Sequence, residues 1–153
     1  VQTFSKVFGL AGLRLGCIIS HSQNIENLIK IHPPFSVNAI ALIAGQAALD
    51  DTEHIEHIIR RNAIEKDYLY QELKKLGLEV RMTDTNFLLA NFGKWSNEVH
   101  QKLITRDILV RNMNGQPLLN GYLRITVGTR KENSRLLEAL KEIIPPEATI
   151  ETK

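Results

Sequence analysis

A lysine, a serine and an arginine stand close together in a glycine-bearing segment near the start of the chain, residues 3–16. The amine of Lys6, in a partly apolar setting beside a second cation, is a potential nucleophile. Arg14 and the hydroxyl of Ser5 are suited to a phosphate, the arginine through paired charge-assisted hydrogen bonds. No Gly-Lys-Ser/Thr follows at Walker-loop spacing. The residues alone therefore predict either a phosphate-binding loop with a reactive lysine or an ordinary loop with an exposed one.

Two further arginines stand on segments with strand-like alternation. Arg111 ends the segment 108–111, and Arg124 lies in the segment 122–127. Because successive strand side chains face opposite sides, Arg124 points away from the apolar side marked by Ile125. If the two strands are neighbours, both guanidiniums converge on one dianion. If they are not, both are solvated surface arginines.

The segment 53–57 places two glutamates and two histidines at helical i, i+3 spacing, which brings like residues onto one face. Zinc and di-iron sites need a third or fourth ligand, and the remaining histidines are isolated in the sequence. We therefore expect a solvated helix N-terminus here, where the glutamates suit the helix dipole, and no metal site.

The composition is that of an ordinary globular protein. The chain has 153 residues, 43% of them hydrophobic and 24% charged, with a formal net charge of +2. These proportions exclude a disordered or fibrous chain and fit about one domain. The lysines and arginines are scattered rather than clustered, which argues against nucleic acid as a partner.

The single cysteine and the apolar segments indicate a reducing, aqueous compartment. Cys17 cannot form an internal disulfide, and its apolar neighbours predict a buried, inert thiol. The longest apolar stretch, residues 37–49, falls short of the ~20 residues that a membrane span requires. We therefore expect a cytoplasmic protein without a membrane partner.

From residue 53 onward the pattern predicts the element order αββαββα, which suits helices on one face of a small, mostly antiparallel sheet. Gly77 is the expected C-cap of the first helix, and Thr129 with Glu132 forms a capping-box pattern before the last. The expected helices are 53–76, 96–105 and 131–144, and the expected strands are 79–81, 86–92, 108–111 and 122–127.

The first fifty residues do not fit that unit. They predict a strand within 15–20, a helix over 23–31, and a second helix over 37–49 that is capped by Ser36 and apolar nearly all round, hence buried. We expect residues 1–51 to be the remnant of a larger α/β domain and residues 52–153 to be a small α+β domain. Since the chain opens at Val1 without an initiator methionine, we expect a C-terminal fragment.

The segment 3–16 closely resembles the lysine signature of fold-type I, pyridoxal-phosphate-dependent aminotransferases of class I/II, and within them the histidinol-phosphate aminotransferases. Ser-Lys, the spacing to Gly-Leu-Arg-Leu-Gly and both flanking glycines match. The resemblance implies that Lys6 is the catalytic residue bonded to pyridoxal 5′-phosphate, and that Ser5 and Arg14 bind the cofactor phosphate. It also implies that the cofactor-ring partners precede Val1, so that the fragment alone is inactive.

The segment 122–129 resembles a second block of the same family. This resemblance implies that Arg124 and Arg111 hold the anionic end of the substrate, while Asn38 and Asn86 match recurring asparagines without an assigned role. The implied enzyme is a homodimer that transfers an amine from histidinol phosphate to the 2-oxo acid 2-oxoglutarate in histidine biosynthesis. The alternatives are a threonine-phosphate decarboxylase, an aromatic aminotransferase or, for this chain alone, a non-enzymatic dimerisation or binding module.

Overall fold

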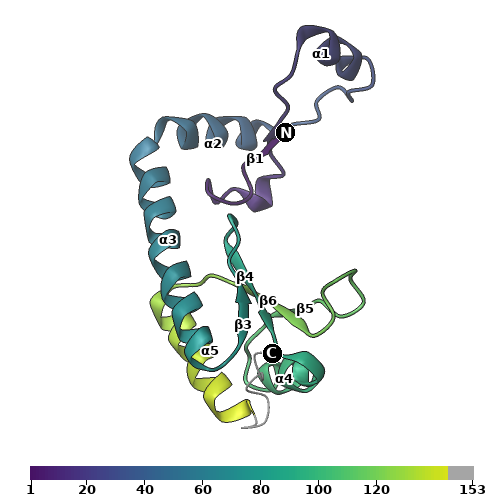
Figure 1. Ribbon diagram of the computed structural model, residues 1–153. Helices are drawn as coiled ribbons and strands as arrows, with labels where there is room; N and C mark the ends of the chain where they lie inside the picture. The colour runs from purple at the N-terminus through teal and green to yellow at the C-terminus, as the bar shows by residue number, and fades with distance from the viewer. Residues whose placement is uncertain (145–153) are drawn as a thin grey trace. The chain divides into compact units, whose positions relative to one another are not determined.

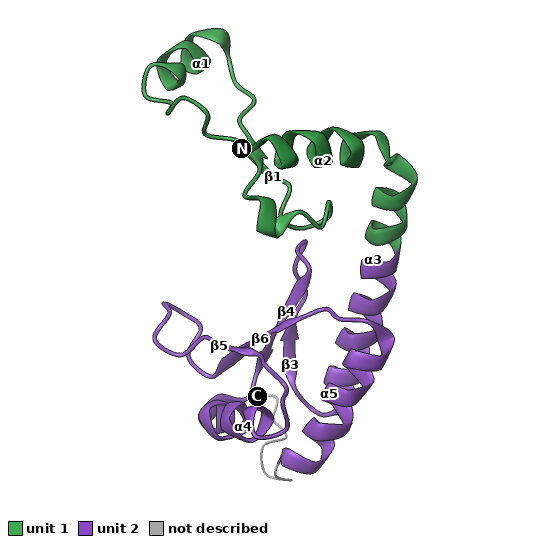
Figure 2. Ribbon diagram, turned by 180° about the vertical axis from the view of Figure 1, so that it is seen from behind, with its two compact units in different colours: residues 1–60 green, residues 61–153 purple. Residues whose placement is uncertain are grey.

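The computed structural model describes residues 1–144, which form two compact units (Figures 1 and 2). The first unit comprises residues 1–60 and the second begins at Arg61, so the division falls within the helix α3 (Thr52–Lys75). The boundary between residues 51 and 52, and the assignment of residues 1–51 to a larger domain, stay predictions.

The second unit contains one antiparallel sheet with the strand order β3-β4-β6-β5. Its elements follow the order αββαββα, as predicted. They are α3, β3 (Glu79–Arg81), β4 (Phe87–Asn91), α4 (Ser96–Ile104), β5 (Arg111–Asn112), β6 (Tyr122–Thr126) and α5 (Arg130–Ile143), with a 3-10 turn, η2 (Gly93–Trp95), before α4.

Alternation along the two central strands separates the faces of this sheet. Leu88 pairs with Ile125 and Ala90 with Leu123, and all four side chains are buried. They pack in one hydrophobic cluster with apolar residues of α3, α4 and α5, so the three helices cover the same face (Figure 1). The fold class, an α/β fragment with an antiparallel sheet in its second part, is confirmed.

The helix ends of this unit form where local signals predict them. Gly77 follows α3 with φ +77°, a left-handed conformation that glycine adopts without strain. Thr129 and Glu132 form both bonds of the capping box at the start of α5. The strand predicted over 108–111 is shorter, because the Ile108 N–H donates to the Leu103 carbonyl of α4 rather than to β6.

The first unit consists of the strand pair β1 (Gln2–Thr3) and β2 (Gly16–Cys17), a 3-10 turn η1 (Ala11–Leu13), and the helices α1 (Ser22–Ile29) and α2 (Ala39–Asp50). The predicted strand 15–20 is thus only two residues long. Cys17 is free and exposed, contrary to the expected buried thiol, since β2 pairs with β1 alone in this unit.

Two predictions for α2 are wrong. Asn38, not Ser36, caps the helix, because its side-chain oxygen accepts from the Ala41 N–H at 2.8 Å. The helix is also not buried: Ala41 and Gly45 alone are buried within it, while Ile43 is 73% exposed. Apolar residues all round a helix predict burial only where neighbouring elements cover every side. No helix among residues 1–144 is long and apolar enough to cross a membrane.

Candidate active site

The segment between β1 and β2 is a loop closed at its base. Gln2 pairs with Cys17 and Thr3 with Gly16, and the Phe4 N–H donates to the Leu15 carbonyl at 3.1 Å. A Cβ on Gly16 would lie 2.9 Å from the Gln2 carbonyl oxygen, so this close pairing requires glycine. The two ends of the loop, residues 4 and 15, are therefore held together by backbone hydrogen bonds.

Lys6 lies exposed at the start of this loop, next to a half-buried Ser5. The Ser5 N–H donates to the Thr3 hydroxyl at 3.1 Å, and the Gly9 N–H donates to the Lys6 carbonyl at 2.9 Å. These bonds hold the backbone around the lysine. Within residues 1–144 the amine makes no ion pair, so it is available to a ligand.

Arg14 lies at the far end of the same loop in a left-handed conformation, with φ 57°. This conformation is uncommon for a residue other than glycine and costs free energy. One guanidinium nitrogen, Nη1, donates to the Ala11 carbonyl at 2.9 Å, which holds the side chain against the η1 turn. A guanidinium has five N–H donors, so most of them are left for an anion.

Asn38 connects this loop to α2. Its amide nitrogen donates to the Leu13 carbonyl at 3.2 Å, while its oxygen caps the helix. Gly45 of α2 lies against the side chain of Leu15. A Cβ at position 45 would lie 2.5 Å from Leu15 Cδ2, so the absence of a side chain permits this close approach. Sequence reasoning assigned Asn38 no role, although an asparagine before an apolar run is a common N-cap signal.

The two other predicted arginines meet in the second unit. β5 and β6 are neighbouring antiparallel strands, and their register places Arg111 directly opposite Arg124. Directly opposite residues share a face of the sheet. That face also carries Arg81, through the pairings of Arg81 with Leu89 and of Leu89 with Arg124. We call this side, opposite the helices, the arginine face.

Neither Arg111 nor Arg124 makes an ion pair within the described part of the chain. The Nε of Arg124 is buried and has no hydrogen-bond partner among residues 1–144. Its guanidinium lies over the ring of Phe87, 5.0 Å from the ring centre. Like charges directly opposite, and a buried donor left unpaired, both cost free energy. Two guanidiniums without acidic partners on one face are a donor set suited to an anion.

Arg81, on the same face, differs because it has an acidic partner. Its Nε lies 3.5 Å from Glu79 Oε1, and its guanidinium lies over the ring of Tyr122. Glu79 also accepts from the Asn91 amide at 2.9 Å and from the Tyr122 hydroxyl at 2.8 Å. These two bonds lower the pKa of Glu79 below its ordinary value of 4.5. Burial, and then the bond to Glu79, raise the pKa of Tyr122.

This arrangement predicts a pH-dependent stability. A carboxyl group with a depressed folded-state pKa stabilises the fold above its unfolded pKa of about 4.5, and loses that effect as pH falls through the folded pKa. We expect Tyr122→Phe to lower the free energy of unfolding by about 1 kcal/mol at pH 7. The difference from the unsubstituted chain should shrink at pH 3.5.

Urea unfolding at both pH values measures this difference, with Tyr70→Phe on α3 as the control. The Tyr70 ring lies beside Lys74, and its substitution should have the same effect at both pH values. A loss for Tyr122→Phe that does not shrink between pH 7 and pH 3.5, nor on further acidification to about pH 2.5, would show that the Glu79 carboxylate is not involved.

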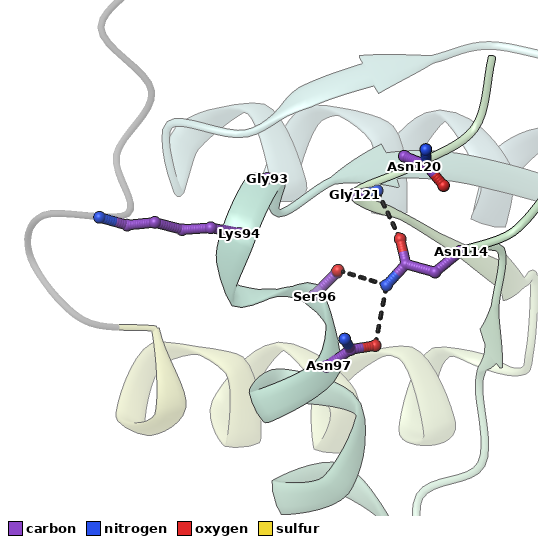
Figure 3. Close-up of a pocket in the computed structure, with 7 residues that line it drawn as sticks. All are labelled: Gly93, Lys94, Ser96, Asn97, Asn114, Asn120 and Gly121. Carbon is purple, nitrogen blue, oxygen red and sulfur yellow. Dashed lines mark hydrogen bonds between the residues drawn. The ribbon is translucent and has the colours of Figure 1, made fainter.

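A pocket of about 330 Å³ lies beside the start of α4 and the loop that joins β5 to β6 (Figure 3). The side chain of Asn114 lines this pocket and bonds to three of the other lining residues. Its amide nitrogen donates to Ser96 Oγ at 3.0 Å and to Asn97 Oδ1 at 2.8 Å, and its oxygen accepts from the Gly121 N–H at 2.6 Å. These contacts fix the connection between β5 and β6, and so support the register that pairs Arg111 with Arg124.

The described residues contain no group of three or more His, Cys, Asp or Glu that could hold a metal ion. The cofactor candidates are instead the residues of the first loop. A primary amine that forms a covalent bond with an aldehyde, and a guanidinium and a hydroxyl that donate to a phosphate, are a donor set that fits pyridoxal 5′-phosphate. Ser5, Lys6 and Arg14 belong to the first unit, and Arg111 and Arg124 to the second.

Comparison with known proteins agrees with this chemistry. The family model described as aminotransferase class I and II matches residues 1–140. Histidinol-phosphate aminotransferase 1 of Carboxydothermus hydrogenoformans is 41% identical over 144 residues, covering 94% of this chain and 41% of that relative. The chain thus spans about two fifths of the length of the curated relatives it matches.

Two solved structures have the same fold. Histidinol-phosphate aminotransferase from Sinorhizobium meliloti, in complex with pyridoxal-5′-phosphate, has a TM-score of 0.86 and 29% identity, covering 93% of this chain and 39% of that one. L-threonine-O-3-phosphate decarboxylase from Porphyromonas gingivalis has a TM-score of 0.81 and 26% identity, covering 92% and 44%. These similarities confirm the predicted resemblance, and the match to the family model over residues 1–140 identifies the chain as a member of the aminotransferase class I and II family.

Proposed function

We propose that these residues belong to a pyridoxal-phosphate-dependent aminotransferase that acts on a phosphorylated amine, most specifically histidinol phosphate, with 2-oxoglutarate as the amino acceptor. The observation that carries the proposal is the arginine pair. Arg111 and Arg124 lie directly opposite each other, without an acidic partner among residues 1–144. Such a pair is suited to a dianion.

The charge of the substrate favours a phosphate ester over a carboxylate. A phosphate monoester carries about −1.5 to −2 charges at pH 7 and three acceptor oxygens, whereas a carboxylate carries one charge and two oxygens. Two guanidiniums match the phosphate in charge and exceed the carboxylate. Histidinol phosphate combines this group with the primary amine that the reaction requires.

The first loop has the residues to hold the cofactor. In this proposal Arg14 and Ser5 bind the cofactor phosphate, and the amine of Lys6 bonds to the aldehyde. When bound, pyridoxal phosphate supplies an electron sink for bond breaking at the α-carbon of the substrate. Once displaced by the incoming amine, Lys6 Nζ would accept the proton from that α-carbon and deliver it to the C4′ carbon of the cofactor, and the second half of the reaction would run this transfer in reverse with the acceptor.

A threonine-phosphate decarboxylase is the second candidate, because a protein of that name is among the similar solved structures. Its substrate also carries a phosphate ester, so the arginine pair fits both activities. The products distinguish them: an aminotransferase forms glutamate from 2-oxoglutarate, whereas a decarboxylase releases carbon dioxide.

Product analysis of the whole protein tests the proposal. Supplied with pyridoxal phosphate, histidinol phosphate and 2-oxoglutarate, it should form glutamate, and no carbon dioxide should appear with threonine phosphate. Carbon dioxide from threonine phosphate, without glutamate from histidinol phosphate, would favour the decarboxylase. The family resemblance also supports two further proposals, that the whole protein is a homodimer and that it is cytoplasmic. Sedimentation of the whole protein tests the homodimer.

A further inference from the structure

Two neighbouring residues of α3 hold the two loops that border one end of the sheet. Lys66 Nζ donates to the Thr83 carbonyl at 2.7 Å and to the Thr85 carbonyl at 3.2 Å. Both carbonyls belong to the loop between β3 and β4. Glu65, the preceding residue, contacts the segment that follows β6. We call Glu65 and Lys66 the α3 clamp.

Glu65 is a buried carboxylate with three hydrogen bonds. Arg130 Nε donates to both of its oxygens, at 3.1 and 3.0 Å, and Asn133 Nδ2 donates to Oε2 at 3.1 Å. Glu65 is 8% exposed and Asn133 only 2%. Arg130 also stacks on Tyr68, with the guanidinium carbon 3.7 Å from the ring centre. A carboxylate at this depth needs such partners, so the contact fixes α5 against α3 at its first turn.

Asn133 connects Glu65 to the backbone that follows β6. Its oxygen accepts from the Gly128 N–H at 3.0 Å, and its amide nitrogen donates to the Gly128 carbonyl at 3.1 Å. A Cβ on Gly128 would lie 3.0 Å from the Glu132 side chain, so the turn lies closely against α5. The backbone just after β6 is thereby tied to Glu65 through one buried amide.

The two loops are also bonded to each other. The Val127 N–H donates to the Asn86 carbonyl at 2.9 Å, which joins the turn after β6 to the loop before β4. Phe87, whose ring lies under the guanidinium of Arg124, follows Asn86 directly. The strand that carries Arg124 and the aromatic ring that supports its guanidinium are thus both tied to the α3 clamp.

We propose that Glu65 and Lys66 are positioning residues for the anion site, and that they hold Phe87 and the end of β6 so that Arg124 is aimed at the anion before it binds. This inference rests on the proposed function, because it takes Arg111 and Arg124 as the anion site. Donors held in place before binding cost no reorganisation when the anion arrives, which raises affinity.

Binding of inorganic phosphate to the 153-residue chain tests the clamp. The probe is inorganic phosphate at pH 8, and binding is followed by the backbone amide NMR signals of β5 and β6, which every variant retains. Glu65→Gln keeps the shape of the side chain but removes the charge that holds Arg130, and it should raise the phosphate Kd about tenfold, equivalent to ~1.4 kcal/mol. Glu72→Gln is the matched control, since Glu72 lies on the same helix and pairs with Lys75 of α3 itself.

A second variant and a double-mutant cycle separate positioning from general stability. Lys66→Met, which releases the other loop, should raise the Kd in the same direction, and it decides the matter if Glu65→Gln does not fold. In an Arg124→Ala background, Glu65→Gln should have no further effect on the Kd, because the clamp acts through Arg124. A merely structural role would lower the melting temperature without this coupling.

The outcomes are distinct. Weaker phosphate binding in both clamp variants, absent in Glu72→Gln and in the Arg124→Ala background, supports the proposal. Unchanged phosphate affinity in folded Glu65→Gln and Lys66→Met, with binding still dependent on Arg124, overturns the clamp and leaves the proposed function intact. If Arg124→Ala binds phosphate as well as the unsubstituted chain does, the anion site itself is wrong, and the clamp with it.

Discussion

The whole protein with Lys6→Ala is expected to lose turnover by at least ~10⁴-fold while it keeps its fold, because both the covalent attachment of the cofactor and the proton transfer at the α-carbon depend on one amine. Lys6 lies exposed on a loop whose backbone is held by its own hydrogen bonds, so removal of the side chain creates no cavity. Steady-state formation of glutamate measures the loss.

Lys30→Ala is the control for this experiment. Lys30 is also exposed in the first unit, and its amine donates to Asn27 at 2.9 Å. It should retain full activity. Borohydride reduction followed by peptide mass spectrometry locates the cofactor, which we expect on Lys6 alone. A phosphopyridoxyl group on another lysine, or a Lys6→Ala enzyme of full activity, would contradict the assignment.

Arg124→Ala is expected to lower kcat/KM for the phosphorylated amine by about 10²- to 10³-fold, the range for removing one partner of a buried, hydrogen-bonded charge pair. Arg124→Lys should recover only part of this loss, because an ammonium group lacks the planar fork that binds two phosphate oxygens. Arg111→Ala should cost less, since Arg111 is exposed whereas Arg124 is half-buried with a buried Nε.

Arg81→Ala is the matched control on the same face. Arg81 already has Glu79 as a partner, so its loss should change kcat/KM by less than about threefold. The non-phosphorylated substrate histidinol provides a second comparison. If Arg124 binds the phosphate, Arg124→Ala should reduce turnover of histidinol far less than that of histidinol phosphate. Equal losses for the two substrates would mean that Arg124 acts elsewhere.

Local signals in the sequence predicted most of the second unit. The capping box at Thr129, the C-cap at Gly77 and the alternation along β4 and β6 depend on residues a few positions apart, and each appears in the structure. The pairing of Arg111 with Arg124 was a conditional expectation. In the structure β5 and β6 are neighbouring strands, and Arg111 lies directly opposite Arg124.

Features that depend on residues far apart in the sequence could not be predicted from local patterns. The strand expected over 108–111 is short because two backbone groups of the segment bond to α4: the Ile108 N–H to Leu103, and the Val110 carbonyl to the ring of His100. The buried contact of Glu65 with Asn133 joins residues 68 positions apart, and no local pattern in the sequence predicts it.

The exposure of α2 shows another limit. Its composition is apolar nearly all round, which correctly marks a helix but says nothing of what covers it. Within the first unit Ala41 and Gly45 are the buried residues of α2, and Gly45 lies against Leu15 of the loop. The large apolar side chains of the helix lie exposed, namely those of Ile40, Leu42, Ile43 and Leu49. Burial is a property of the surrounding elements, whereas helix formation and capping are properties of the segment itself.

The most direct test of the central claim is the first half-reaction of the whole protein loaded with pyridoxal phosphate. Histidinol phosphate is added without an acceptor, and the visible absorbance of the lysine-bound cofactor is followed. The proposed function predicts that this absorbance disappears as the amine is transferred, and that 2-oxoglutarate restores it with formation of glutamate. Absorbance that persists in the presence of histidinol phosphate would contradict the claim.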